Sequence, residues 1–221
     1  MQEASFWTAE EIDLSADANN WDNKLSDSEC ALFSMILAFF ASADSIVTEN
    51  LLEWFLSEVQ LPEARFFYSF QAAMENIHSE VYSSLIQELI RDTVHHDRLL
   101  HGIAEFPCVA NKTDWALKWI QSAAPFSQHL VAFAAVKGIF FSGSFAAIYW
   151  IKRRGLLPSL CFSNELICRD EGIHTDFACL LYGKLANKLP IAVLSSILTE
   201  ACTVEKDFWR HMLCLLSFES V

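Results

Sequence analysis

The chain has 221 residues, enough for a large domain with a buried core, and many Phe (18) with few Gly (6) and Pro (5) favour an all-α protein with long helices. A formal net charge of -13 argues against nucleic acid as a partner, because phosphates would be repelled. Seven cysteines without a Cys-x-x-Cys pair argue against a disulfide framework and favour reduced thiols in a cytoplasmic protein.

The first segment, residues 1–25, is predicted to be an irregular N-terminal arm that holds Trp7. Within it, Thr8-Ala9-Glu10-Glu11 is a capping sequence that predicts a short turn. The first residues are acidic and lack an apolar stretch, so a signal peptide is not expected.

Prolines, glycines and capping residues divide the rest of the chain into long predicted helices. Pro62 suits the first turn of a helix, and Gly155 suits the position just after one. His95-His96-Asp97 is predicted to lie in an exposed connector, which is favoured over a surface metal site. In chain order, the predicted helices cover about 27–59, 62–92, 114–122, 125–155, 159–186 and 190 to almost the end.

One stretch allows two interpretations. Residues 130–151 carry a single charge, Lys137, and are followed by Lys152-Arg153-Arg154. This length and flanking charge fit a transmembrane helix. A central helix that is buried on all sides of a bundle fits equally, and we favour it because the neighbouring helices offer amphipathic partners.

Two Glu-x-x-His pairs carry the strongest chemical signal, Glu75 with His78 and Glu171 with His174. Residues three apart share a helix face, so each pair presents a carboxylate and an imidazole in one direction. Asp44 is a lone carboxylate in an apolar helix and needs a partner. We predict that these five residues form one site in an all-α bundle, as in di-iron carboxylate proteins. Such a site suits iron or manganese with open positions for O₂.

Five stretches carry a resemblance that covers nearly the whole chain: 4–14, 74–80, 138–145, 163–167 and 169–174. They include Met74-Glu75-Asn76-Ile77-His78-Ser79-Glu80 and Arg169-Asp170-Glu171-Gly172-Ile173-His174. On these residues the chain resembles the small, radical-generating subunit of class I ribonucleotide reductase, eukaryotic type. The resemblance implies a ferritin-like long-helix bundle, with residues 1–221 as a single domain.

The resemblance also implies roles for individual residues. It implies a tyrosyl radical on Tyr82 and an electron-transfer route through Trp7 and Asp170, with Asp170 orienting His78 from behind. Asp170 precedes Glu171 by one residue, so it points about 100° away and is not expected to bind the same metal. The implied metal ligands are Asp44, Glu75, His78, Glu171 and His174. The implied apolar shield of the tyrosine is Phe141, Phe145 and Ile167.

The expected function is therefore that of the small subunit of ribonucleoside-diphosphate reductase. Its di-iron centre and radical would let the large subunit reduce ribonucleotides to deoxyribonucleotides for DNA synthesis. The expected partners are that large subunit and a second small subunit, in a homodimer or a heterodimer. Nucleic acid and membrane are not expected as partners, and the expected location is the cytoplasm.

One departure from the family lies at Lys137, where a sixth ligand, a glutamate, is expected before 138–145. Asp44, Glu75 and Glu171 carry three negative charges, and a protonated Lys137 reduces the formal total to two, which balances one divalent ion. We predict that Lys137 occupies part of the second metal position and forms salt bridges with its carboxylates, so that the centre binds one metal or none. A neutral Lys137 that binds metal as an amine is the alternative.

A second departure concerns the C-terminal part, where the resemblance fades after about Phe208. The family's remaining C-terminal helices and its docking tail are expected to be absent, which predicts weak affinity for the large subunit. The expected absence of the tail and the presence of Lys137 both allow a second possible function. The chain could be a degenerate paralogue that acts as a structural or regulatory partner of an intact small subunit.

Overall fold

The structure is a computed structural model that describes residues 5–50 and 55–217, except for the side chains of 45–50 and 215–217. All regular secondary structure in this part of the chain is helical, so the all-α expectation is confirmed. In chain order the elements are η1 (Ala9–Glu11), α1 (Ser15–Lys24), α2 (Asp27–Asn50), α3 (Leu56–Glu58), α4 (Pro62–Leu89), α5 (Thr93–Leu100), α6 (Gly102–Glu105), α7 (Pro107–Ile120), α8 (Phe126–Ala135), η3 (Val136–Phe140), α9 (Ser142–Arg153), α10 (Pro158–Lys184) and α11 (Ile191–Ser217).

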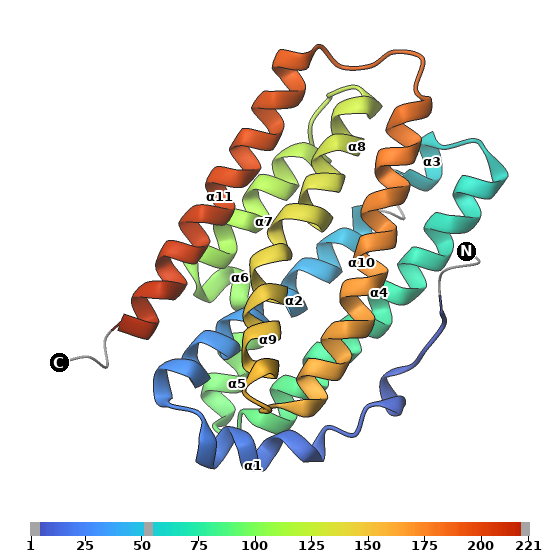
Figure 1. Cartoon of the computed structure of the whole chain (residues 1–221). Coiled ribbons are helices and arrows are strands. Elements are labelled where there is room, and N and C mark those ends of the chain that lie inside the picture. Colours follow the sequence, from blue (N-terminus) through green and yellow to red (C-terminus); the bar gives the residue numbers. More distant parts are fainter. Residues whose placement is uncertain (1–4, 51–54, 218–221) are drawn as a thin grey trace.

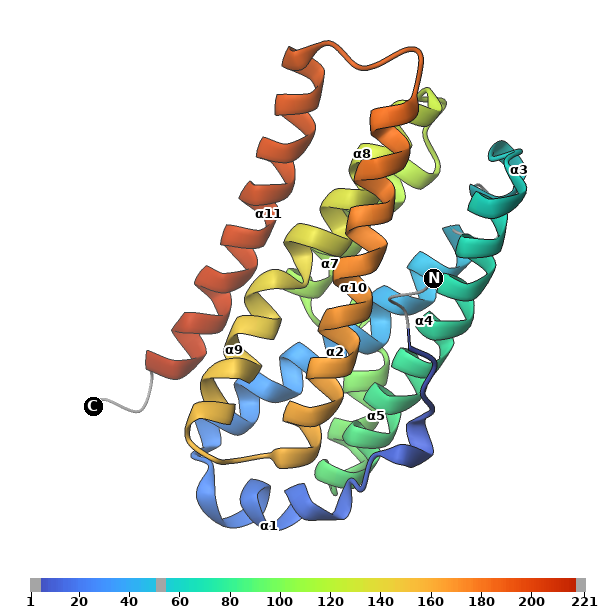
Figure 2. The same ribbon diagram turned by 45° about the vertical axis from the view of Figure 1, so that its right-hand side comes forward.

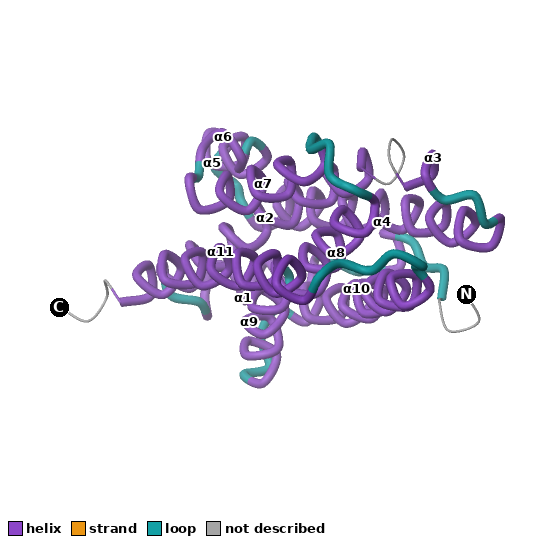
Figure 3. The backbone as a smooth tube through the Cα atoms, turned by 90° about the horizontal axis from the view of Figure 1, so that it is seen from above, coloured by secondary structure: helices purple, strands orange, loops and turns teal. Residues whose placement is uncertain are grey.

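The long helices form two layers (Figure 3). One layer contains α2, α4 and α7, and the other contains α8, α10 and α11. Helix α4 lies beside both α2 and α10, and α11 covers α7 and α2 (Figures 1 and 2). The core between the layers is strongly aromatic, with Phe33, Phe39, Phe40 and Tyr68 almost completely buried. This arrangement places the middle of α2, α4 and α10 around one buried point.

Several predicted boundaries were wrong. Residues 1–25 are not irregular throughout, since α1 lies within them and Trp21 packs into the core. His95-His96-Asp97 lies inside α5, whose first turn is capped by the Asp92 carboxylate, rather than in a connector. Helix α7 begins at Pro107, well before the predicted start. The continuity of the predicted 27–59 helix across 51–54 lies outside the described residues.

The predicted turn at the N-terminus is confirmed as η1. The Thr8 backbone N–H donates to Glu11 Oε1 at 3.0 Å, and the two residues form a capping box. This short element holds the chain next to Trp7, which is buried.

The apolar stretch is a continuous helical segment built from α8, η3 and α9 in succession (Figure 1). Within the described residues it is long and apolar enough to cross a membrane, but 61% of its most apolar window is buried in the protein. Its middle, η3, is π-helical and was not predicted. A π-helical turn inserts an extra residue and re-aims its side chains, and such turns often mark functional sites. Here it directs Lys137 into the core, where only 2% of the residue is exposed.

Asp17 of α1 fixes the start of α10. Its two carboxylate oxygens accept hydrogen bonds from the backbone N–H groups of Ser159 and Leu160, each at 2.8 Å. These N–H groups have no partner within a helix, and a carboxylate is also favoured at the positive end of the helix dipole. Burial raises the pKa of Asp17, and the two N–H donors oppose that effect.

We expect Asp17→Ala to lower the free energy of unfolding by about 2–3 kcal/mol, because it leaves two buried donors without an acceptor. Urea denaturation followed by circular dichroism would measure the loss. Asp22→Ala is the matched control on the same helix, since Asp22 forms a surface pair with Arg91, and it should cost less than about 1 kcal/mol. Equal losses in the two variants would contradict this role.

Candidate metal centre

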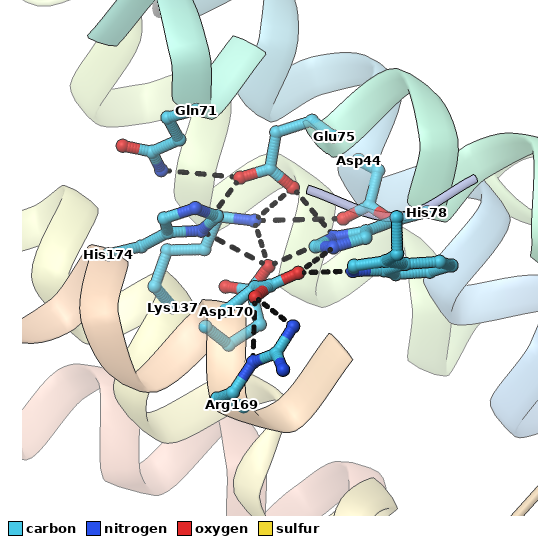
Figure 4. Close-up of polar contacts among 10 residues, drawn as sticks. Asp44, Gln71, Glu75, His78, Lys137, Arg169, Asp170 and His174 are labelled. Carbon is cyan, nitrogen blue, oxygen red and sulfur yellow. Dashed lines mark hydrogen bonds and ion pairs between the residues drawn. The ribbon is translucent and has the colours of Figure 1, made fainter. Parts of the chain in front are cut away.

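The structure brings together all five residues that the sequence predicted as metal ligands (Figure 4). Asp44 comes from α2, Glu75 and His78 from α4, and Glu171 and His174 from α10. They form two groups of three with ligand atoms within 4.8 Å of one another, Asp44–Glu75–His78 and Glu75–Glu171–His174. Glu75 belongs to both groups, so the arrangement has the shape of a two-metal site with a shared carboxylate.

The helical spacing works as predicted within each pair. His78 Nδ1 lies 3.4 Å from Glu75 Oε2, and His174 Nδ1 lies 3.5 Å from Glu171 Oε1. The two pairs are also in contact with each other, because His174 Nδ1 of α10 lies 3.2 Å from Glu75 Oε1 of α4. Each pair therefore faces the other across the α4–α10 contact.

Lys137 enters the middle of this group from η3. Its Nζ lies 2.8 Å from Glu75 Oε2, 2.9 Å from Glu171 Oε1 and 3.7 Å from Asp44 Oδ1. The predicted salt bridges between Lys137 and the carboxylates are confirmed. An ammonium group therefore stands where positive charge is needed to hold three buried carboxylates together.

The charges in the centre stabilise one another. Burial raises the pKa of both glutamates, but the Lys137 ammonium and His174 outweigh it, so the pKa of Glu75 lies well below its usual range and that of Glu171 is about 2. Burial lowers the pKa of Lys137, but the three carboxylates raise it above its usual value. Lys137 is therefore a charged ammonium in the metal-free protein.

Asp44 differs from the two glutamates. It is fully buried, and burial raises its pKa to about 8 in spite of the opposing effect of Lys137. Its contact with the ammonium is also the longest of the three. Asp44 is thus the carboxylate with the weakest counter-charge in the centre.

The donor atoms fit a divalent metal ion. Within the described part of the chain, five atoms of the centre take part in no hydrogen bond, although three of them have ion-pair contacts: Asp44 Oδ1 and Oδ2, His78 Nδ1, Glu171 Oε2 and His174 Nδ1. A buried polar atom without a hydrogen bond costs about 1–3 kcal/mol, so a group of them in one place indicates a binding site. Mixed carboxylate and imidazole donors suit iron and manganese.

Asp170 joins the centre to Trp7 from the outside. Asp170 Oδ2 lies 3.3 Å from His78 Nε2 and accepts a hydrogen bond from Trp7 Nε1 at 2.8 Å, while Arg169 donates to the other oxygen. The ring of Trp7 also stacks on His78, with centroids 5.8 Å apart. The predicted contact of Asp170 with His78 is confirmed. The Asp170 carboxylate accepts a hydrogen bond from His78 Nε2, so the other ring nitrogen of His78, Nδ1, faces the centre.

Tyr82 lies in an apolar layer beside the centre. It is 1% exposed, and its hydroxyl has no hydrogen-bond partner within the described residues. Burial, followed by the nearby carboxylates, raises its pKa well above 10, so it is a neutral phenol. Phe40 stacks on it at 4.7 Å, and Phe141 and Phe145 pack on Phe40 at 5.3 and 5.5 Å. Ile167 is also completely buried.

Two residues at the site were missed in the sequence. Phe40, rather than Phe141 or Phe145, makes the direct ring contact with Tyr82. Gln71 is buried and donates from Nε2 to Glu75 Oε1 at 3.2 Å. Phe40 lies four residues before Asp44, and Gln71 lies four residues before Glu75. Residues four apart share a helix face, so this spacing would have found both.

Comparison with known proteins gives a consistent result. The model of the family "Ribonucleotide reductase, small chain" matches residues 1–219. A small chain of the ribonucleoside-diphosphate reductase of Arabidopsis thaliana is 58% identical over 206 residues, which cover 93% of this chain and 60% of that protein. Small chain 1 of Saccharomyces cerevisiae is 55% identical over 212 residues, which cover 96% of this chain and 53% of that protein. The chain thus spans little more than half the length of these relatives.

Solved structures show the same fold. The Rnr4 homodimer of the ribonucleotide reductase of Saccharomyces cerevisiae matches with a TM-score of 0.84 and 38% identity, covering 95% of this chain and 66% of that one. The R2 subunit of Clostridium botulinum matches with a TM-score of 0.86 at 20% identity, covering 94% and 68%. These proteins have the ferritin-like fold, so the predicted ferritin-like long-helix bundle is confirmed.

Proposed function

The chain belongs to the ribonucleotide reductase small-chain family, and we propose that it acts as a small subunit of ribonucleoside-diphosphate reductase. In this role it contributes to the reduction of ribonucleotides to deoxyribonucleotides, which supplies precursors for DNA synthesis. The observation that supports this most directly is the group of five buried ligands beside a buried, neutral tyrosine.

Each part of the site has a task in this proposal. Asp44, Glu75, His78, Glu171 and His174 would hold iron or manganese, which supplies one-electron oxidation with O₂ when it is bound. Tyr82 would store the oxidising equivalent as a radical, because its apolar surroundings exclude water and other reductants. Asp170 and Trp7 would pass an electron between the centre and the surface of the bundle.

We also propose partners and a location. The large subunit of the reductase would dock on this chain, and a second small subunit, identical or not, would pair with it. The matching yeast structure is that of a homodimer. All seven cysteines are free, which suits the reducing cytoplasm.

Lys137 favours a second candidate function. Its ammonium contacts three of the carboxylates that would otherwise bind metal. A small chain with a weakened metal centre could still serve as a structural or regulatory partner of an intact small subunit.

A reductase assay separates the two candidates. The recombinant chain would be mixed with a purified large subunit and cytidine diphosphate, with and without an intact small subunit. The first function predicts a deoxyribonucleotide product from this chain alone, and that product is lost in Tyr82→Phe. Tyr68→Phe is the matched control, because Tyr68 lies on the same helix and its hydroxyl is equally buried and unpartnered within the described residues. No product from this chain alone, together with a changed product yield of the intact small subunit when this chain is added, would support the second function.

A further inference from the structure

The ammonium of Lys137 uses the donor atoms of the two halves of the centre unequally. Its short contact to Glu75 is with Oε2, the oxygen that also faces His78, and its third contact is with Asp44. In the Asp44–Glu75–His78 half, the Glu75 oxygen that faces His78 is therefore engaged by a cation, which leaves Asp44 and His78 as the donors there. Lys137 also contacts Glu171 Oε1, which lies 3.5 Å from both His78 Nδ1 and His174 Nδ1.

The other half keeps a complete set of donors. Glu75 Oε1 faces His174 Nδ1 at 3.2 Å and accepts a hydrogen bond from Gln71, while Lys137 contacts the other oxygen of Glu75. His174 Nδ1 and Glu171 Oε2 have no hydrogen-bond partner within the described chain, since Lys137 engages the other oxygen of Glu171. Two carboxylates and one imidazole thus converge beside the ammonium (Figure 4).

We propose that the centre binds one divalent cation of the iron(II) or manganese(II) class, held by Glu75, Glu171 and His174. The Lys137 ammonium takes the place of a second ion beside Asp44 and His78. This inference rests on the proposed function for the class of metal, and it assigns the position and the number of ions.

Formal charge agrees with a single ion. When all three carboxylates are counted as ionised, they sum to zero with one ammonium and one divalent ion, whereas a second divalent ion would leave two positive charges in a buried site. Uncompensated charge at such depth is strongly unfavourable. The ammonium therefore limits the number of ions as well as their position.

A surface pocket leads to the same half of the centre. It has a volume of about 460 Å³ and lies between the η3–α9 segment and α10. Its lining includes Lys137 and Glu171, together with Gly172, where a Cβ would meet no atom within 4 Å, whereas the other four residues of the centre do not line it. An ion that enters here reaches the centre at Glu171, a residue of the proposed half.

Manganese(II) binding to the metal-free chain tests the proposal without any assay of activity. Equilibrium dialysis with elemental analysis should give one manganese per chain. His174→Ala should weaken binding at least about tenfold, whereas His78→Ala should change it by less than about threefold. Lys137→Glu should raise the count to two, since it removes the ammonium and adds a carboxylate.

Two ions or none per wild-type chain would overturn the proposal. Loss of binding in His78→Ala with retention in His174→Ala would overturn it as well, because the ion would then occupy the opposite half. Circular dichroism confirms that each variant is folded, and the comparison of wild type with Lys137→Glu remains decisive if a histidine variant does not fold. The ion count does not depend on the reductase assay, so the proposed function and this inference fail separately.

Discussion

Replacing Lys137 with glutamate is expected to produce a tyrosyl radical at least about tenfold more abundant than in the wild-type chain. The ammonium of Lys137 contacts Glu75, Glu171 and Asp44, and its charge repels a second metal ion from the position beside them. A glutamate there would bring the carboxylates to four, which balance two divalent ions. Anaerobic loading with iron(II), exposure to O₂ and electron paramagnetic resonance would measure the radical.

Three variants give this experiment its controls. The signal of Lys137→Glu should vanish when Tyr82→Phe is added and persist when Tyr68→Phe is added, since both tyrosines are buried on α4. Lys152→Glu makes the same charge change at an exposed position and should leave the signal at the wild-type level. A strong signal in the wild-type chain would show that Lys137 does not block the centre.

Replacing Lys112 with methionine is expected to lower the free energy of unfolding by about 3–5 kcal/mol. Lys112 is 1% exposed, and its Nζ lies 2.6 Å from Glu205 Oε2 and donates to the carbonyl of Phe140 at 2.8 Å. The ammonium also lies over the rings of Phe39 and Phe208, 3.9 and 3.7 Å from their centroids. Methionine fills the space but leaves the Glu205 carboxylate buried without a counter-charge. Denaturation in urea would measure the loss.

This ion pair should also be visible in the pH dependence of stability. Burial lowers the pKa of Lys112 to about 8, although Glu205 opposes that effect. Between about pH 8 and the unfolded-state pKa near 10.5, the folded chain therefore holds fewer protons than the unfolded chain. Stability should rise with pH in this window, and the rise should be absent in Lys112→Met.

Two further variants separate the buried charge from the loss of a side chain. The double variant Lys112→Met/Glu205→Gln removes both charges and should lose less stability than Lys112→Met alone. Lys118→Met removes a lysine from the same helix, but its pair with Glu200 is exposed, so the loss should stay below about 1 kcal/mol. If Lys112→Met costs no more than Lys118→Met, the buried pair does not stabilise the bundle.

The sequence by itself determined the ligand pairs. A spacing of three residues on a helix fixes a shared face, so Glu75 with His78 and Glu171 with His174 could be paired without a structure. The same reasoning predicted that Asp170 does not point at the metal position, and in the structure Asp170 contacts the outer ring nitrogen of His78. These are local properties of a helix, because the backbone hydrogen bonds set the direction of every side chain.

Only the tertiary structure decided how the ligand-bearing helices pack against the rest of the bundle. The position of Lys137 depends on the π-helical turn of η3, and the sequence predicted a regular helix there. The contact of Phe40 with Tyr82 and the reach of Asp17 to the start of α10 join segments that lie far apart in the chain. Such contacts depend on which helices pack together and at what depth, a property of the whole core rather than of any local spacing. The ligands and the salt bridges of Lys137 with their carboxylates were therefore readable from the sequence, whereas the π-helical turn that carries Lys137 and the packing around the centre were not.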